Sequence, residues 1–188
     1  MHLLGLVLAA GEGRRYGGPK GLGRTADGTA WVQLAAQTLR AGGCDEVVVL
    51  VGARGDEVAA LVPADALVVE VPDWSEGLAA TLRAGLGAAG DAGADAVVVL
   101  PVDMPDAPAA VVARVLAIAA DDDGALVQAV YRGVPGHPVV IGRRHFPALA
   151  PALVGDRGAR EYLVRSGAVE VECSDLWDGH DIDRPADA

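Results

Sequence analysis

A glycine-rich loop with three cationic side chains holds the residue types best suited to chemistry. Residues 8–20 read LAAGEGRRYGGPK and follow the apolar run at residues 3–8. Glycines let backbone N–H groups approach a ligand closely, and a nest of such groups binds anions. Arg14, Arg15 and Lys20 add positive charge to the loop. The sequence therefore predicts a polyphosphate site directly after a buried strand.

The spacing of this loop disfavours two large classes of phosphate-binding protein. A Walker A loop needs the pattern G-x-x-x-x-G-K-[ST], but here Pro19 precedes Lys20 and Gly21 follows it. The glycines at 11, 13 and 17 also miss the G-x-G-x-x-G dinucleotide pattern by one residue. Kinase-like and NAD-dependent functions are therefore poor fits to this sequence.

Carboxylates at two later positions suit a metal ion. Asp103 follows the apolar run at 96–100, and a carboxylate buried there is costly unless it is paired. Mg²⁺ is usually held by one or two carboxylates together with substrate phosphates. Asp181 and Asp183 near the end of the chain have a D-x-D spacing, which in a strand places both on one face. We expect Asp103 to hold Mg²⁺.

Short Val/Leu/Ile runs alternate with Ala-rich stretches and must position these residues. Continuous apolar runs such as 47–51 are typical of parallel strands buried on both faces. The alternation predicts an α/β fold with three layers, in which helices cover both faces of a mostly parallel central sheet. Strands are expected at 3–9, 45–51, 66–71, 96–101, 126–131, 138–141 and 168–172, and helices at 30–41, 54–61, 76–89, 107–120, 143–150 and 157–166.

Polar residues beside two of the expected helices suggest local roles. Ser75 is expected to N-cap the helix at 76–89, and Asp106 the helix at 107–120. The acidic run at 121–123 is interpreted as a solvated turn. The loops at 9–20, 72–81 and 101–106 all follow expected strands, where α/β sheets bind their ligands.

Composition limits the class of protein and the choice of partner. The 188 residues are 52% apolar, which predicts one domain over residues 1–188 with a well-filled core. The net charge of −11 argues against nucleic acid as a partner. Cys44 and Cys173 are expected to be reduced thiols, and no apolar stretch is long enough to cross a membrane. A cytoplasmic location is expected.

Five blocks of the chain together resemble a known family. The loop matches L-A-x-G-x-[SG]-x-R-[MFY]-G-x-x-K, and further blocks lie at 72–86, 99–105, 136–160 and 179–187. In this order they resemble the MobA/MocA-like nucleotidyltransferases, with the closest likeness to molybdenum cofactor cytidylyltransferases. The resemblance implies a Rossmann-like, GT-A-like nucleotidyltransferase fold and a Mg²⁺-dependent enzyme that binds an NTP.

The resemblance also implies roles for individual residues. Arg15, Lys20 and Asp103 would be catalytic. A second metal carboxylate would come from the closing segment, where Asp181 and Asp183 are the candidates and Asp183 is favoured by its position, although Arg184 replaces the usual threonine. Nucleotide contacts would come from Leu8, Ala9, Ala10, Gly11, Glu12, Gly13, Arg14, Arg15, Lys20, Gly77, Leu78 and Thr81. Acceptor contacts would come from Gly136, His137, Asp156 and Arg160.

The function implied is transfer of an NMP group to a phosphorylated small molecule with release of pyrophosphate. CTP and molybdopterin are the favoured substrates, because L-A-A-G with Ala10 resembles the cytidylyl branch and L-A-G-G the guanylyl branch. Transient contact with a molybdoenzyme or its maturation factor would follow. The alternatives are a guanylyltransferase, a transferase acting on a sugar phosphate or another small molecule, and a non-catalytic nucleotide-binding chaperone for the cofactor.

Overall fold

A twisted sheet forms the centre of the computed structural model, which describes residues 1–184. Within these residues seven strands pair in the order β3-β2-β1-β4-β6-β5-β7. Their bounds are β1 (Leu3–Ala9), β2 (Glu46–Val51), β3 (Leu67–Glu70), β4 (Ala96–Pro101), β5 (Leu126–Tyr131), β6 (Val134–Gly142) and β7 (Val169–Glu172). The block at 179–187 and the domain at 1–188 therefore extend beyond the described residues.

The directions of the strands create a crevice at one edge of the sheet. Neighbouring strands are parallel except where β6 pairs with β4 and with β5, so the expected mostly parallel sheet is confirmed. From β1 the chain passes to β2 on one side and later returns to β4 on the other. At such a switch point the loops after the two strands diverge and leave room for a ligand. Here these are the loops after Ala9 and after Pro101.

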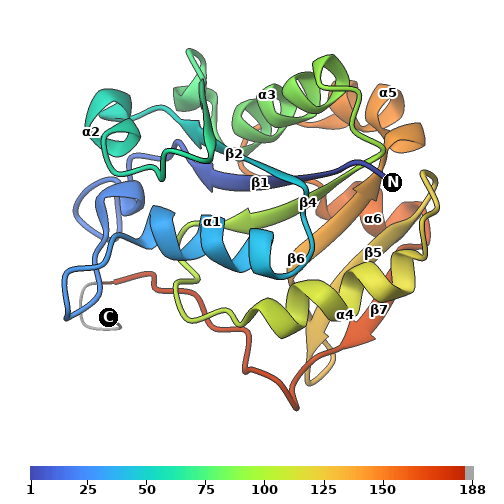
Figure 1. Ribbon diagram of the computed structural model, residues 1–188. Coiled ribbons are helices and arrows are strands. Elements are labelled where there is room, and N and C mark those ends of the chain that lie inside the picture. The colour runs from blue at the N-terminus through green and yellow to red at the C-terminus, as the bar shows by residue number, and fades with distance from the viewer. Residues whose placement is uncertain (185–188) are drawn as a thin grey trace.

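Helices cover both faces of the sheet and complete the three layers (Figure 1). Those of the described chain are α1 (Trp31–Ala41), α2 (Gly55–Ala59), α3 (Leu78–Asp91), α4 (Ala109–Ala119), α5 (Phe146–Leu149) and α6 (Arg160–Arg165). One apolar cluster joins the sheet to α1 and α4, and a second joins it to α3, α5 and α6. None of these helices is long and apolar enough to cross a membrane. Cys44 and Cys173 are buried free thiols, as expected.

Two expected helix starts are wrong, and one expected helix is broken. The helix expected at 76–89 begins at Leu78, after a 3-10 turn, and its N-cap is Gly77 rather than Ser75. The helix expected at 107–120 begins at Ala109 with Pro108 as its N-cap, so Asp106 does not cap it. The segment expected to be helical at 143–150 divides into two 3-10 turns that flank a single α-turn.

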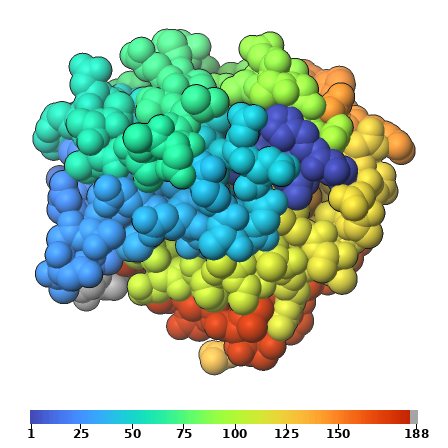
Figure 2. Space-filling model, viewed as in Figure 1, coloured from blue at the N-terminus to red at the C-terminus, as the bar shows by residue number. Residues whose placement is uncertain are grey.

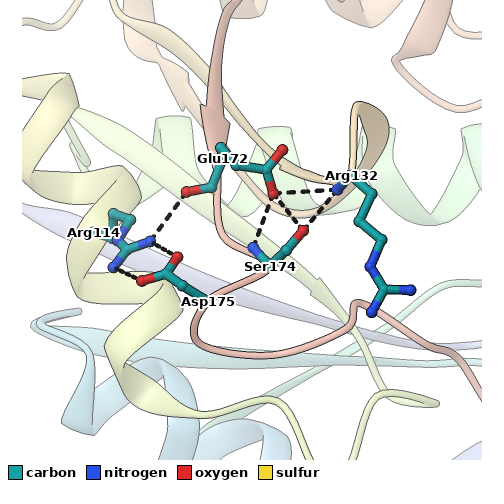
Figure 3. Close-up of polar contacts among 5 residues, drawn as sticks. All are labelled: Arg114, Arg132, Glu172, Ser174 and Asp175. Atoms are coloured by element: carbon teal, nitrogen blue, oxygen red, sulfur yellow. Dashed lines mark hydrogen bonds and ion pairs between the residues drawn. The ribbon is translucent and has the colours of Figure 1, made fainter.

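A polar cluster anchors the chain where it leaves β7 (Figure 3). The Glu172 carboxylate accepts hydrogen bonds from the backbone N–H groups of Arg132 (3.2 Å) and Ser174 (2.9 Å) and from the Ser174 hydroxyl. Arg114 of α4 donates to the Glu172 carbonyl oxygen (3.0 Å) and to the Asp175 carboxylate (2.8 Å). In Figure 2 the red C-terminal part of the chain lies directly beneath the yellow-green α4. These contacts fix the start of the segment that follows β7.

The Glu172 anchor predicts a loss of stability in acid. The Ser174 hydroxyl and the surrounding N–H groups lower the pKa of Glu172 to about 2, whereas an unfolded glutamate titrates near pH ~4.3. Because the folded pKa is the lower one, the stabilisation is complete above the unfolded pKa and is lost as pH falls toward about 2. Urea unfolding should therefore show a gap between the wild type and Glu172→Gln at neutral pH that closes in acid.

A neighbouring glutamate supplies the control for this experiment. Glu170 lies on the same strand and is exposed, and its carboxylate makes no hydrogen bond within the described chain. Glu170→Gln should therefore follow the wild type at every pH. A gap for Glu172→Gln that persists unchanged at low pH would contradict the role given to its ionised carboxylate.

Candidate active site

The loop after β1 is shaped by one glycine and leaves a row of free N–H groups. The Gly13 carbonyl accepts hydrogen bonds from the N–H groups of Tyr16, Gly17 and Gly18, at 3.0, 2.9 and 3.2 Å. Gly13 has a φ of 62°, and a Cβ there would overlap the Gly18 carbonyl, so no other residue fits. Within the described chain the N–H groups of residues 11–15 donate to no protein acceptor. This arrangement is suited to binding phosphate oxygens.

A cleft of about 510 Å³ opens in front of this loop at the expected edge of the sheet. Fourteen of the eighteen residues predicted for the site line it. Those on its wall are Leu8, Ala9, Ala10, Gly11, Glu12, Gly13, Arg14, Lys20, Gly77, Leu78, Thr81, Asp103, His137 and Asp156. The loop, the start of α3 and the end of β4 thus meet in one place, as the sequence predicts.

The other four predicted residues do not line the cleft wall: they are Arg15, Gly136, Arg160 and Asp183. Asp183 does not line the cleft wall, but its carboxylate lies in the cluster at its floor. Arg15 is largely exposed and reaches Asp183 at 3.5 Å. Gly136 and Arg160 are not on the wall: Gly136 packs against the Tyr131 ring, and Arg160 is exposed at the start of α6.

Lys20 joins carboxylates that come from opposite ends of the chain. Its Nζ lies 2.8 Å from Asp103 Oδ2 and 2.8 Å from Asp183 Oδ1. The side chains of Lys20 and Asp103 are only 16% and 17% exposed, so this contact is largely shielded from water. Burial acts to lower the pKa of Lys20, but the hydrogen bonds with Asp103 and Asp183 outweigh it and raise that pKa.

The two carboxylates on Lys20 differ in their surroundings. Burial raises the pKa of Asp103 in spite of Lys20, and Asp103 Oδ1 is a buried oxygen with no hydrogen-bond partner among residues 1–184. The hydrogen bond with Lys20 lowers the pKa of the more exposed Asp183. A buried carboxylate oxygen without a partner is costly, and a further cation beside it would relieve that cost.

Three carboxylates here fit a hard divalent cation. Oxygen atoms of Asp103, Asp181 and Asp183 all lie within 4.8 Å of one another. Carboxylate oxygens are the ligands that Mg²⁺ and Mn²⁺ prefer. Ile182, between the two C-terminal aspartates, is buried, and its N–H donates to the Asp103 carbonyl at 2.9 Å. The D-x-D pair thus presents both carboxylates on one side, although the segment forms no strand.

The start of α3 forms the opposite wall of the cleft. Gly77 has a φ of 102°, and a Cβ there would overlap the Asp156 carboxylate. The Ala79 N–H donates to the Gly155 carbonyl at 2.9 Å, which holds the Asp156 loop against the helix. Thr81 is only 4% exposed and faces the cleft. Sequence spacing located this segment correctly but did not reveal the contact with Asp156.

His137 brings a neutral ring to the cleft. Burial lowers its pKa to about 4, against a smaller opposing effect of Asp181. The imidazole is therefore uncharged at neutral pH and can both donate and accept a hydrogen bond.

Eight further residues line the cleft and were not among the predicted site residues. They are Gly21, Trp74, Ser75, Glu76, Pro101, Val102, Met104 and Asp181. Seven of them directly adjoin predicted residues or lie in the blocks at 72–86 and 99–105, so proximity in sequence could have included them. Asp181 was recognised as an alternative to Asp183, and the structure brings both to the cluster.

Comparison with known proteins gives a consistent result. The MobA-like NTP transferase domain matches residues 5–170. Nicotine blue oxidoreductase of Paenarthrobacter nicotinovorans is 35% identical over 194 aligned positions, which cover 95% of this chain and 91% of that protein. Molybdenum cofactor guanylyltransferase of Cereibacter sphaeroides is 38% identical over 108 residues, which cover 57% of this chain and 53% of that protein.

Solved structures share the fold. Rv0371c from Mycobacterium tuberculosis H37Rv superposes with a TM-score of 0.82 and 26% identity, covering 100% of this chain and 95% of that chain. A manganese complex of the same protein superposes with a TM-score of 0.74 and 24% identity, covering 92% of this chain and 88% of that chain. These likenesses confirm the expected three-layer, Rossmann-like nucleotidyltransferase fold. The chain is a nucleotidyltransferase and belongs to the MobA-like NTP transferase family.

Proposed function

We propose that this enzyme transfers CMP from CTP to a phosphorylated pterin, molybdopterin, with release of pyrophosphate, and that residues 1–188 form one domain for this reaction. The observation that carries the proposal is the partnerless, buried oxygen of Asp103. It stands beside two more carboxylates and Lys20, at the floor of a cleft whose rim is a row of free N–H groups. Cation, phosphate and nucleotide sites are thereby combined in one cleft.

The loop and Lys20 would handle the phosphates. The free N–H groups of residues 11–15 would bind phosphate oxygens, and Lys20 and Arg15 would neutralise charge that grows on the α-phosphate and on the leaving pyrophosphate. In the reaction an acceptor phosphate oxygen attacks the α-phosphorus, and the bond from that phosphorus to the β-phosphate oxygen breaks. Positioning and electrostatic stabilisation are the protein's main contributions to such a transfer.

A divalent ion would be held by Asp103, Asp183 and Asp181, and we propose Mg²⁺. When bound, it would offset phosphate charge as a Lewis acid. The donor set supports this choice, because all three ligands are carboxylates and one has a buried oxygen that no group in the described part of the chain satisfies. The manganese complex of Rv0371c is a further reason to assign a divalent ion here.

The nucleotide and the acceptor would occupy opposite ends of the cleft. Gly77, Leu78 and Thr81 would contact the base and ribose, while His137 and Asp156 would contact the acceptor. Since Gly136 and Arg160 lie off the wall, we assign Gly136 a packing role and place Arg160 outside the direct acceptor site.

The L-A-A-G sequence that contains Ala10 supports cytidine as the base, through its resemblance to the cytidylyl branch. Ala10 itself is 1% exposed, and its carbonyl accepts the Ala53 N–H at 2.9 Å. An NTP-using enzyme with reduced, buried thiols fits the cytoplasm, where a molybdoenzyme or its maturation factor could receive the product.

A second candidate function is oxidoreduction, because the relative from Paenarthrobacter nicotinovorans carries that activity in its name and aligns with 95% of this chain. The cluster of three carboxylates and Lys20 argues against it. Hydride transfer needs no such cation site, whereas phosphoryl chemistry does.

Replacing Asp103 tests the metal site. Asp103→Asn keeps the shape of the side chain but removes its charge, so pyrophosphate release should fall at least about 100-fold while CTP still binds. Asp91→Asn is the matched control: Asp91 is exposed at the end of α3, does not line the cleft, and its carboxylate makes no hydrogen bond or ion pair within residues 1–184. Its turnover should match that of the wild type. Unchanged turnover in Asp103→Asn would refute the metal role.

A substrate panel tests the base and the acceptor. With molybdopterin and Mg²⁺, CTP should exceed GTP by at least about tenfold in kcat/KM, the scale of discrimination that pocket shape provides. Equal rates with GTP would reject the cytidine assignment, and turnover with sugar phosphates alone would reject the pterin. Reduction of nicotine blue with a reduced nicotinamide dinucleotide, without pyrophosphate release, would favour the second candidate.

A further inference from the structure

The position of Asp181 has no explanation in its own contacts. It is exposed and makes no hydrogen bond or ion pair within residues 1–184. Residues 173–184 also form no helix or strand. Between Trp177 and Ile182 the described backbone makes no N–H bond to another backbone carbonyl. Some other contact must therefore hold this segment so that Asp181 reaches the cluster.

The ends of the segment are tied down, whereas the polar contacts of its middle are confined to His180, which bonds to Asp178 at 2.7 Å and lies 3.9 Å from the Asp106 carboxylate. At the start, Glu172, Ser174 and Arg114 fix the exit from β7 (Figure 3). At the far end, the Ile182 N–H donates to the Asp103 carbonyl at 2.9 Å. The chain between these two points must cross from the outer edge of the sheet to its crevice.

The ring of Tyr131, at the end of β5, supports that middle stretch. Tyr131 is 6% exposed, and a Cβ on Gly179 would overlap its ring, so the backbone at Gly179 lies directly against the ring. Trp177 packs edge-on against the same ring, with 5.5 Å between centroids. Gly179 stands two residues before Asp181 and has a φ of 79°. The turn that aims Asp181 into the cluster is thus built on Tyr131.

The same side chain reaches the other wall of the site. The Tyr131 hydroxyl donates to the His137 carbonyl at 2.7 Å. A Cβ on Gly136 would lie 2.9 Å from two carbons of the ring, so the strand that carries His137 also packs closely on it. Tyr131 therefore lies between the segment that bears the carboxylates and the strand that bears His137.

We propose that Tyr131 is a positioning residue, whose ring sets the place of Asp181 and Asp183 and thereby the affinity of the site for a divalent cation. The inference rests on the proposed metal role of these carboxylates. It assigns the effect to the ring rather than to the hydroxyl, because the ring bears the Gly179 turn while the hydroxyl bonds only to His137.

Cation binding measured with Mn²⁺ alone tests the inference. The free Mn²⁺ signal in electron paramagnetic resonance gives Kd without reference to turnover, and circular dichroism gives Tm. Tyr131→Leu should weaken Mn²⁺ binding at least about tenfold, the usual cost of removing a residue that orients a metal ligand. Tyr131→Phe keeps the ring and should stay within about twofold of the wild type.

Tyr162 provides a control for general loss of stability. It is buried to a similar degree, at 9% exposure, and its hydroxyl also makes one hydrogen bond, to His145 at 2.9 Å. Tyr162 packs in the apolar cluster on the opposite face of the sheet. Tyr162→Leu should lower Tm much as Tyr131→Leu does but leave the Kd for Mn²⁺ unchanged. Equal weakening of Mn²⁺ binding in both variants would overturn the inference.

A substitution in the segment itself keeps the test decisive if Tyr131→Leu does not fold. Gly179→Ala places a methyl group against the Tyr131 ring and should weaken Mn²⁺ binding with Tyr131 intact. Wild-type affinity in Gly179→Ala would then reject the role of the ring. Absence of saturable Mn²⁺ binding by the wild type is a different result, because it would reject the proposed metal site itself.

Discussion

The rest of the structure depends on a buried carboxylate at the end of a central strand. Asp103 has one oxygen on Lys20 and one without a partner, and it lies where burial raises its pKa. Such a group is stable only if cations are brought to it. Lys20 comes from the β1 side, and the pairing of Leu8 with Pro101 sets the ends of β1 and β4 side by side. Because β1 and β4 end side by side at the switch point of the sheet, the loop after β1 can bring Lys20 to Asp103.

Asp181 and Asp183 complete the carboxylate cluster, and they come from the last part of the chain rather than from the sheet. Oxygen atoms of three carboxylates lie within 4.8 Å of one another, so the groups repel each other unless a cation stands among them. Attraction to Lys20 reaches Asp183 but not Asp181. Apolar packing and backbone contacts must then hold the segment against the repulsion. A tyrosine face is a suitable support, since it is rigid and buries a large apolar area.

How far the sequence predicts this structure depends on the range of each contact. The strands, the loop at 8–20 and Asp103 were predictable, because apolar runs and glycine spacing are local signals. The cap assigned to Ser75 was wrong because the Asp156 loop packs against Gly77 and requires a positive φ there. That contact joins residues far apart in sequence, so no local pattern contains it.

Other features of the site could not be predicted from the sequence for the same reason. Arg160 resembles a site residue by its motif, yet its helix is placed so that it stays exposed and off the cleft wall. Tyr131 lies in an ordinary strand pattern and has no motif, yet it contacts both Gly179 and His137. Motifs thus located the groups that we propose to touch substrate, while the groups that orient them became visible only through tertiary packing.

Charge balance explains why a nucleotide and a cation belong together in this cleft. The whole chain carries a net charge of −11, so its long-range field repels a triphosphate. Locally, Lys20 and Arg15 face three carboxylates, and Lys20 is already engaged by two of them. A bare triphosphate would add negative charge to a site that has no surplus of positive charge. Under the proposed function, a divalent ion on the carboxylates would compensate for the charge of the carboxylates and for that of the triphosphate. Lys20 would then be free to bind the phosphates.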